Sequence, residues 1–572
     1  MLQLQRSRTQ VKGTKTVSTI EVTRHFIRVG EREVHYRRAG SGPPFVLFHV
    51  SPQSSAFVMP HFLLLADNYT LIALDSPGYG NSDPLPLTAP TMADYADAVL
   101  ETLDALGISR APVFGSHTGA NIAVELARRS PERVAALVLD GLSVNTSDVS
   151  QERTSNYATQ FVPTADGAHL AWAWQHTRDQ LLFWPWYKPY KANRLRIDMK
   201  SAEYIHDVVL AKMTAANYWL GYRAAFSHDS TDALRQLIVE THFVTPDADV
   251  HTAVERSLGG LPSNIHFIDT TEEGQIDAVR NVLAAIDGDH AVKEPPKPSH
   301  RQQLYQTYVS TGQGQRLARL GGQETGRPLV LLHGSMSTSA VLTNRAATLA
   351  TGRPVLALDI AGNGDSDPLP QSDSDLETFA EDVRAVLADW GLDSFDVFGE
   401  SVGATLAIEI ARQDDQRIGK LILDRPEVPS AEMRSDLVAN VAPAIEARSD
   451  GSHFLTAWHM LRDASLFWPW YRHTKEAVRN IEPNIEPVAL QSRLLAWLKS
   501  GKTYGEYIRA SLEANIEPTL RNLKLPCLVI GTKGDILESH AYRVADGLAK
   551  ARLILTDSQP PPASVMIEFL DS

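Results

Sequence analysis

The chain repeats itself at a fixed distance. Several short motifs recur at a separation of 284 positions, as His49 and His333 do. The pairs are Leu47–His49 with Leu331–His333, Ala73–Gly78 with Ala357–Gly362, Ser82–Pro86 with Ser366–Pro370, and Phe183–Tyr187 with Phe467–Tyr471. A constant separation means that no net insertion divides the copies over this span. Because so long a period does not fit a solenoid, the sequence predicts a duplicated domain.

Apolar runs and helical patterns alternate within each half. Runs such as 44–48, 71–74 and 135–139 are typical of strands that are buried on both faces, and a helical pattern covers 92–100. This alternation predicts a parallel sheet covered by helices on both sides. Each half also inserts a long helical segment, at about 144–234 and about 429–520, which predicts a cap over one end of the sheet.

These patterns divide the chain into four parts: a tail over 1–22, a first domain over 23–286, a linker over 287–303 and a second domain over 304–572. The first 20 residues carry basic side chains, no acidic ones and no apolar segment of the secretory kind, so we expect a disordered tail. Proline and charged residues over 287–300 suit a semi-rigid surface linker. We expect the two halves to pack together within the chain.

Composition narrows the range of functions. The 572 residues carry a net charge of −14, which argues against a nucleic-acid partner. No apolar run approaches the length of a membrane-spanning helix, so we expect no membrane association and a cytoplasmic location. The single cysteine, Cys527, excludes a disulfide framework and a zinc–thiolate cluster.

The second half contains a glycine-rich turn between a strand and a helix. The apolar run 396–398 leads into Gly399-Glu400-Ser401-Val402-Gly403, and a helical pattern follows at once. In this context Gly-x-Ser-x-Gly is a nucleophile elbow, which presents a serine at the end of a parallel sheet. Gly399 and Gly403 are needed because the turn is tight and the helix packs close to the strand. Ser401 is therefore the candidate nucleophile.

With this elbow, the alternating strands and helices and the inserted cap, each half resembles the α/β-hydrolase superfamily over nearly its whole length. The resemblance implies an α/β fold class: two tandem α/β-hydrolase domains, each a mostly parallel sheet covered by helices with a helical cap insertion. It further implies a Ser–acid–His triad, an oxyanion hole of backbone amides and a small-molecule ester or amide substrate. It calls for no metal and no cofactor.

The resemblance assigns roles around Ser401. Attack by the serine hydroxyl places negative charge on a carbonyl oxygen, which requires N–H groups that are already in position. Val402 in the elbow is one expected donor. The loop after the strand at 329–332 supplies the other, from Ser335 or Met336.

The rest of the implied triad is incomplete. The acid is expected after the seventh strand, at Asp535, with Asp424 as the alternative. The histidine is expected after the last strand, where Gln559 stands instead, and an amide cannot act as a general base. The other histidines that could border the site are His540, His453 and His459.

The first half differs at the same positions. The repeat places His117 where the second half has Ser401, within the turn at 115–119. Local alignment of the segment at 245–249 matches Asp249 with Asp535. A His117–Asp249 dyad could act as a base. No histidine follows the last strand of this half, so we expect it to be mainly structural. His117 has no neighbours at ligand spacing, so the sequence predicts no metal site.

The two caps share an aromatic signature that includes Trp458, Arg462 and Trp468 in the second half. Such side chains suit the lining of an apolar substrate pocket, and Arg462 or its counterpart Arg178 suits a carboxylate or carbonyl group. The alternative is that they form the core of the cap, with an Arg–Asp pair at its surface.

Three functions remain open, because a fold alone does not fix a function. The first is a serine-type hydrolase of a small apolar or aromatic ester, lactone or amide, with the second half active. The second is a non-hydrolytic, lyase-type enzyme that uses His117 and Asp249. The third is a non-catalytic ligand-binding protein, which the missing histidines favour.

Overall fold

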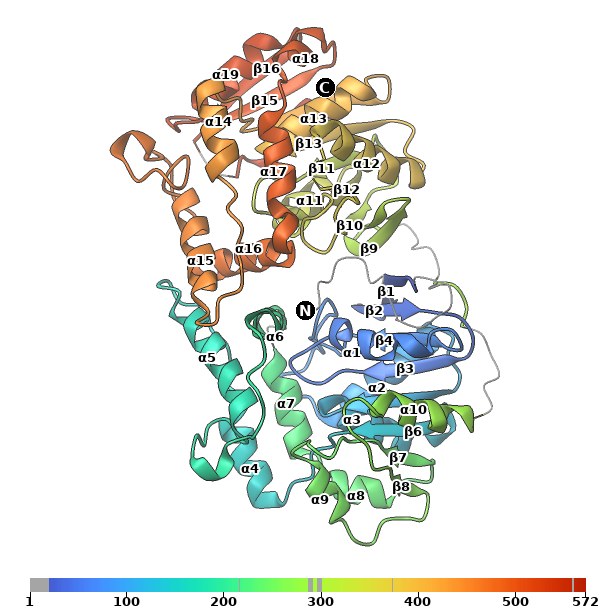
Figure 1. Cartoon of the computed structure of the whole chain (residues 1–572). Helices are drawn as coiled ribbons and strands as arrows, with labels where there is room; N and C mark the ends of the chain where they lie inside the picture. Colours follow the sequence, from blue (N-terminus) through green and yellow to red (C-terminus); the bar gives the residue numbers. More distant parts are fainter. Residues whose placement is uncertain (1–19, 216, 287–291, 296–300, 373, 558–559) are drawn as a thin grey trace. The chain divides into compact units, whose positions relative to one another are not determined.

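The computed structural model describes residues 20–215, 217–286, 292–295, 301–372, 374–557 and 560–572. Most of the predicted tail, much of the predicted linker and Gln559 lie outside these residues. The described residues form two compact units (Figure 1). The first lies within 1–162 and 172–297, and the second within 163–171 and 298–572.

The first unit contains an eight-stranded sheet in the order β1-β2-β4-β3-β5-β6-β7-β8. Its strands are β1 (Val22–Val29), β2 (Arg32–Ala39), β3 (Pro44–Phe48), β4 (Thr70–Leu74), β5 (Ala111–Ser116), β6 (Val134–Asp140), β7 (Thr241–Phe243) and β8 (Ile265–Phe267). β2 pairs antiparallel with β1 and β4, and all other pairs are parallel.

The second unit repeats this sheet, in the order β9-β10-β12-β11-β13-β14-β15-β16. Its strands are β9 (Tyr305–Thr311), β10 (Gly314–Gly322), β11 (Leu329–Leu332), β12 (Pro354–Leu358), β13 (Phe395–Glu400), β14 (Ile418–Asp424), β15 (Cys527–Thr532) and β16 (Ala551–Thr556). β10 pairs antiparallel with both neighbours, and the other pairs are parallel. The predicted architecture, two tandem α/β domains each built on a mostly parallel sheet, is confirmed.

Helices cover both faces of each sheet. In the first unit they are α1 (Ser55–Phe62), α2 (Met92–Ala105), α3 (Thr118–Arg129), α4 (Ser147–Asn156), α5 (Ala168–Leu182), α6 (Ala202–Thr214), α7 (Tyr218–Ser227), α8 (Ser230–Arg235), α9 (Thr252–Arg256) and α10 (Gln275–Ala284), with 3-10 turns η1 (Leu63–Leu65), η2 (Pro131–Arg133) and η3 (Lys191–Asn193). α5 has residues in both units.

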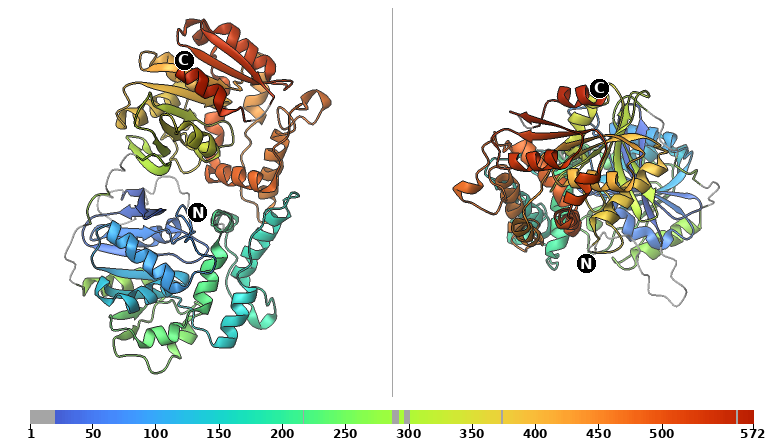
Figure 2. Two further views of the ribbon diagram at one scale, coloured as in Figure 1. Left: turned by 180° about the vertical axis from the view of Figure 1, so that it is seen from behind. Right: turned by 90° about the horizontal axis from the view of Figure 1, so that it is seen from above.

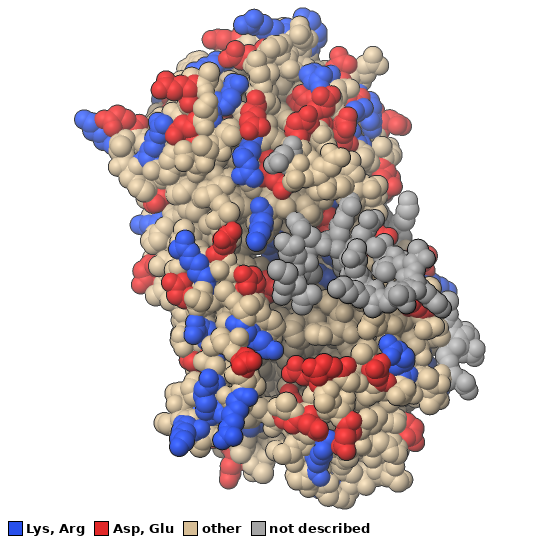
Figure 3. All heavy atoms as spheres, in the orientation of Figure 1, with Lys and Arg blue, Asp and Glu red and all other residues tan. Residues whose placement is uncertain are grey.

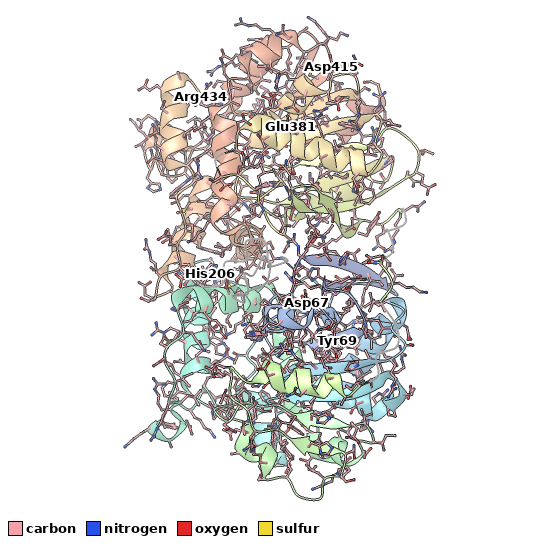
Figure 4. All side chains as sticks on the ribbon, turned by 45° about the vertical axis from the view of Figure 1, so that its right-hand side comes forward. Asp67, Tyr69, His206, Glu381, Asp415 and Arg434 are labelled. Carbon is pink, nitrogen blue, oxygen red and sulfur yellow. The ribbon has the colours of Figure 1, made fainter. Side chains whose placement is uncertain are left out.

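In the second unit the helices are α11 (Thr343–Leu349), α12 (Leu376–Asp389), α13 (Val402–Gln413), α14 (Ala431–Asn440), α15 (Ser452–Ala464), α16 (Pro487–Lys499), α17 (Tyr504–Glu513), α18 (Glu517–Asn522), α19 (Glu538–Gly547) and α20 (Ala563–Asp571), with η4 (Ser339–Leu342), η5 (Lys475–Ala477) and η6 (Gly501–Thr503). Figure 4 marks α12 by Glu381 and α14 by Arg434.

The core follows from the alternation of side chains along each strand. In β11, Val330 and Leu332 pack into the cluster with α12 and α13, whereas Leu329 and Leu331 pack into the cluster with α11 and α20. Successive side chains of a strand point to opposite faces, so one apolar run supplies two cores. This is why the buried strands read as continuous hydrophobic runs.

The helical insertion lies between β14 and β15 and begins with α14, α15 and α16 (Figure 1, and from behind in Figure 2). Its last helices return to the core, where Tyr507 of α17 and Leu520 of α18 join the cluster that covers one face of the sheet. The first unit carries the corresponding insertion between β6 and β7.

The charged surface is mixed in sign. Basic and acidic side chains are interspersed over the face drawn in Figure 3. Among the residues that the structure describes, no helix is both long enough and apolar enough to cross a membrane.

Candidate active site

Each half has one residue in a strained conformation at the turn from strand to helix. Ser401, between β13 and α13, has φ 55° and ψ −121°, and His117, between β5 and α3, has φ 51° and ψ −105°. Positive φ is unusual for a residue with a side chain, and such strain concentrates at functional sites. The backbone therefore forms an elbow in both halves, as the sequence predicts.

The glycines of the elbow are required by close approach. A Cβ atom added at Gly399 would lie 2.1 Å from the carbonyl oxygen of Gly403, and one added at Gly403 would lie 2.6 Å from the carbonyl oxygen of His333. In the first half, a Cβ atom at Gly115 would lie 2.4 Å from the carbonyl oxygen of Gly119. Side chains cannot be accommodated at these distances.

The Ser401 hydroxyl donates a hydrogen bond to a carboxylate. Its Oγ lies 2.5 Å from Oε1 of Glu427, and the indole Nε1 of Trp468 donates to Oε2 of the same carboxylate at 3.3 Å. Among the described residues, Glu427 is the one side chain that hydrogen-bonds this hydroxyl. A serine, a carboxylate and an indole therefore form a chain of hydrogen bonds at the elbow.

Glu427 follows β14 by three residues, and a hydrogen bond holds the backbone of the next residue, Val428. The backbone N–H of Val428 donates to Nδ1 of His540 at 3.0 Å, and the His540 ring meets the Trp468 ring edge-on at 5.2 Å. Burial, assisted by Arg543, lowers the pKa of His540 to about 4, so this imidazole is neutral at pH 7. His540 thus supports Glu427 through Val428 and Trp468.

Asp535 has an arginine partner. Nη2 of Arg479 lies 2.5 Å from Oδ2 of Asp535, and Nε lies 3.3 Å from Oδ1. Arg479 follows η5 in the cap, so the insertion supplies the cation that pairs with this carboxylate. The catalytic role of Asp535 stays a prediction.

A second ionic network lies directly behind the elbow. Arg425 donates to Oε1 of Glu400 at 2.5 Å, and Arg345 lies 3.2 Å from Oδ2 of the buried Asp424. Burial opposes ionisation of Glu400, but the guanidinium groups of Arg425 and Arg345 outweigh it and lower its pKa. Asp424, the alternative acid, is thus engaged in this network, and its backbone carbonyl accepts the N–H of Ser401 at 2.9 Å.

The loop after β11 lies against the elbow, where an oxyanion hole is expected. His333 donates through Nδ1 to the carbonyl of Gly334 at 2.9 Å and accepts the N–H of Ile360 at Nε2 at 3.1 Å. A Cβ atom at Gly334 would lie 3.2 Å from Cβ of Ser401, and Met336 has φ 46°. His333 therefore holds this loop in place. The roles of Ser335, Met336 and Val402 as oxyanion donors stay predictions.

The predicted cap residues separate into two groups. Trp468 reaches Glu427, as described above. Trp458 of α15 is fully buried, and its indole nitrogen has no hydrogen-bond partner in the described part of the chain. Arg462 is partly exposed on the same helix. The substrate-binding roles of Trp458, Arg462 and Trp468 remain predictions.

The cap histidines named as alternatives lie elsewhere. His453 is buried, and its Nδ1 accepts the backbone N–H of Arg448 at 3.1 Å. His459 is exposed. No hydrogen bond between a histidine and Ser401 occurs within the described residues.

In the first half, the two residues of the predicted dyad, His117 and Asp249, lie close together. Nε2 of His117 lies 3.5 Å from Oδ2 of Asp249. Burial lowers the pKa of His117, but the Asp249 carboxylate outweighs burial and, helped by Asp140 and Glu255, raises it to about 9. His117 is therefore a cation at neutral pH. The ring of His251 packs edge-on against His117 at 5.3 Å.

This pair predicts a pH dependence of stability in the first unit. The pKa of His117 is about 9 in the folded chain and 6.5 as the ordinary value, so its contribution is complete below about pH 6.5 and is lost as the pH rises through 9. We expect His117→Gln to remove this pH-dependent contribution, which is on the order of 2 kcal/mol in the free energy of unfolding.

Thermal unfolding of the first unit between pH 6 and pH 9.5 measures this change. His266→Gln serves as the control, because His266 forms a surface pair with Glu240 at 3.1 Å. Equal slopes for His117→Gln and wild type would contradict the prediction.

Several residues of these sites are not apparent in the sequence. Glu427, Arg479, Arg345 and Arg425 surround Ser401 or Asp535, and none belongs to a recognisable motif. The available signal for Glu427 was its place just after β14, where relatives can carry the acid. Arg425 has φ 50°, and the equivalent residue of the first half, Gly141, has φ 65°. Both residues directly follow a strand, so a glycine at this position of the repeat indicates where the strand ends.

No group of three or more histidine, cysteine, aspartate or glutamate side chains in the described chain is arranged to hold a metal ion. Charged groups at each elbow form ion pairs of their own, as His117 does with Asp249 and Arg425 does with Glu400.

Comparison with known proteins agrees with the fold. Residues 43–199 and 327–449 match the model of a family described as the alpha/beta hydrolase fold. A 2-(acetamidomethylene)succinate hydrolase of Mesorhizobium japonicum is 34% identical over 118 residues, which cover 20% of this chain and 42% of that protein. A 2-hydroxy-6-oxononadienedioate/2-hydroxy-6-oxononatrienedioate hydrolase of Dechloromonas aromatica is 31% identical over 140 residues, covering 22% and 47%.

The chain thus spans less than half of the length of either relative. Among solved structures, the enol-lactonase from Burkholderia xenovorans LB400 is 18% identical with a TM-score of 0.37, covering 46% of this chain and 100% of that one. The two family matches fall on the two sheets described above, one in each half. The chain belongs to the α/β-hydrolase superfamily and carries two of its domains in tandem.

Proposed function

We propose that the second unit is a serine hydrolase in which Glu427 replaces the triad histidine as the base. The observation that carries this proposal is the 2.5 Å hydrogen bond from Ser401 Oγ to Glu427 Oε1 at a strained elbow. A serine hydroxyl is a weak nucleophile unless an adjacent base takes its proton. A carboxylate within hydrogen-bond reach meets that requirement.

In the proposed reaction, Ser401 Oγ attacks the carbonyl carbon while its proton passes to Glu427. The Trp468 indole keeps the carboxylate in position through its second oxygen. Collapse of the tetrahedral intermediate breaks the bond to the leaving group, which takes the proton from Glu427. Water then attacks the acyl-enzyme, again with Glu427 as the base, and releases the acid and the free serine. Backbone N–H groups of Val402 and of Ser335 or Met336 would stabilise the oxyanion.

The substrate class we propose is a small ester, lactone or amide with an apolar or aromatic portion. The aromatic residues of the cap support this choice, and the relatives named above are hydrolases by name. The first unit, which has His117 in place of the serine, would be mainly structural.

A fluorophosphonate probe tests the nucleophile directly. We expect the wild-type chain to be labelled at Ser401 and to hydrolyse p-nitrophenyl esters. Ser401→Ala should abolish both, whereas Ser116→Ala, at the neighbouring position of the first elbow, should change neither. A wild-type chain that is neither labelled nor active across a panel of esters, lactones and amides would refute the proposal. Saturable binding without turnover would then favour the ligand-binding alternative.

A second candidate rests on the His117–Asp249 pair in the first unit. Because the pKa of His117 is raised to about 9, this residue would act as a proton donor at neutral pH rather than as the base of a lyase-type reaction. Turnover that survives Ser401→Ala but is lost in His117→Gln would support this function.

A further inference from the structure

Arg493 differs from the other arginines around the elbow of the second unit. It lies on α16 in the cap, is partly buried, and its Nη1 donates to the hydroxyl of Ser465 at 3.3 Å. Within the described residues it has no carboxylate partner in ion-pair range. α16 packs beside η4, in the segment that follows the expected oxyanion loop.

The other guanidinium groups in this region already have acidic partners. Arg425 pairs with Glu400 and Asp424, Arg345 pairs with the same two carboxylates, and Arg479 pairs with Asp535. Glu427 is bonded to Ser401 and Trp468. These carboxylates are therefore engaged, and among the described residues none of them lies within ion-pair range of Arg493.

Arg493 interacts electrostatically with charged groups near the elbow, although it forms no ion pair with those that the structure describes. Burial lowers its pKa, the Glu400 carboxylate opposes this effect, and the guanidinium groups of Arg425 and Arg479 add to it. Glu400 is the residue immediately before Ser401, so the charge of Arg493 is felt next to the proposed nucleophile. A partly buried cation without a counter-ion is costly, and a carboxylate is the group that a guanidinium pairs with most favourably.

We propose that Arg493 binds a carboxylate of the substrate, so that the substrate is an ester, lactone or amide that also carries a free carboxylate group. This inference rests on the proposed function for the reaction and on Arg493 for the recognition. It differs from the expectation for Arg462, which lies on α15 and makes no hydrogen bond through its side chain among the described residues. Arg462 is therefore the competing candidate for the same carboxylate within this cap.

The first test compares two aryl esters of similar size. Mono-p-nitrophenyl succinate carries a carboxylate and p-nitrophenyl butyrate does not. We expect wild type to prefer the succinate ester in kcat/KM. Arg493→Gln should reduce kcat/KM for the succinate ester by about 10- to 100-fold, as expected for the loss of a charged hydrogen-bonding partner, and change that for the butyrate ester by less than about 3-fold. Lys475→Gln, which removes a largely exposed cation of η5 in the same cap, should change neither.

A second test does not require turnover. In the Ser401→Ala variant, binding of phenylacetate is compared with binding of benzyl alcohol by quenching of tryptophan fluorescence. We expect phenylacetate to bind more tightly, and Arg493→Gln to abolish that difference. If esters are not hydrolysed but phenylacetate binds through Arg493, the hydrolase proposal fails and this inference stands.

Equal effects of Arg493→Gln on charged and neutral ligands would overturn the inference. Loss of the carboxylate preference in Arg462→Gln, but not in Arg493→Gln, would overturn it as well. Circular dichroism of each variant shows whether the fold is retained, and Arg493→Lys, which keeps the charge, should retain part of the preference even where Arg493→Gln is poorly folded.

Discussion

Glu427→Gln is expected to lower kcat/KM for ester hydrolysis by about 10²- to 10⁴-fold, the usual contribution of a general base. The glutamine side chain has nearly the same shape, so the hydrogen bond with Ser401 can still form. An amide cannot accept the serine proton, however, and the nucleophile loses its base. The measurement is steady-state hydrolysis of p-nitrophenyl butyrate, together with the rate of fluorophosphonate labelling.

Glu432→Gln is the control, because Glu432 is an exposed glutamate in the first turn of α14 that follows the same strand. We expect it to keep wild-type activity. Glu427→Asp should retain more activity than Glu427→Gln, because a carboxylate remains although it is displaced by one methylene group. Full activity and labelling in Glu427→Gln would rule out a catalytic role for this carboxylate.

Asp382→Ala is expected to destabilise the second unit by about 3–5 kcal/mol. Arg316 of β10 is fully buried, and it binds Asp382 of α12 through two hydrogen bonds, both of 2.7 Å. Removal of the aspartate leaves a buried guanidinium without its charge partner. The pair joins the second strand from the edge of the sheet to a helix that covers the sheet, so its loss weakens their packing.

The first unit supplies the control for this prediction. Arg32 stands at the position of Arg316, but its partner Glu101 is largely exposed, and the two atoms are 2.9 Å apart. Exposed pairs contribute about 0–1 kcal/mol, so Glu101→Ala should have little effect. Hydrogen exchange of peptides from each unit reports the two effects separately. A loss below about 1 kcal/mol in Asp382→Ala would contradict the prediction.

The two elbows have the same backbone conformation, but their aspartates pair with different charged side chains. In the first half, the elbow residue His117 is itself the partner of Asp249. In the second half the elbow residue is Ser401, and Asp535 receives its partner from the cap, as Arg479. The aspartate of each half thus has a cationic neighbour, which comes from the elbow in the first half and from the cap in the second.

Much of the fold could be predicted because its signals are local. Strands such as β11 and β13 are continuous apolar runs, and Gly399 and Gly403 can be recognised because the turn leaves no space for a Cβ atom. The constant separation of the repeat then carries assignments from one half to the other as far as the aromatic motif of the cap.

The partner of Ser401 could not be predicted in the same way. Glu427 belongs to an irregular segment after β14, and Trp468 and Arg479 belong to the cap, so their contacts depend on how those segments fold back over the sheet. The resemblance to the family predicts a histidine after the last strand, because the family places the base there. A carboxylate that follows a different strand has no spacing that distinguishes it from an ordinary surface glutamate.

The duplication, the strand-to-helix elbow and the absence of a histidine at the family's usual position can all be recognised in the amino-acid sequence. The side chain that meets the Ser401 hydroxyl, and the cations that reach the neighbouring carboxylates, are apparent only in the folded chain. Backbone geometry at the elbow is dictated by residues adjacent in sequence, whereas the charges at the site come from segments far apart in the chain. Those segments meet only in the folded chain.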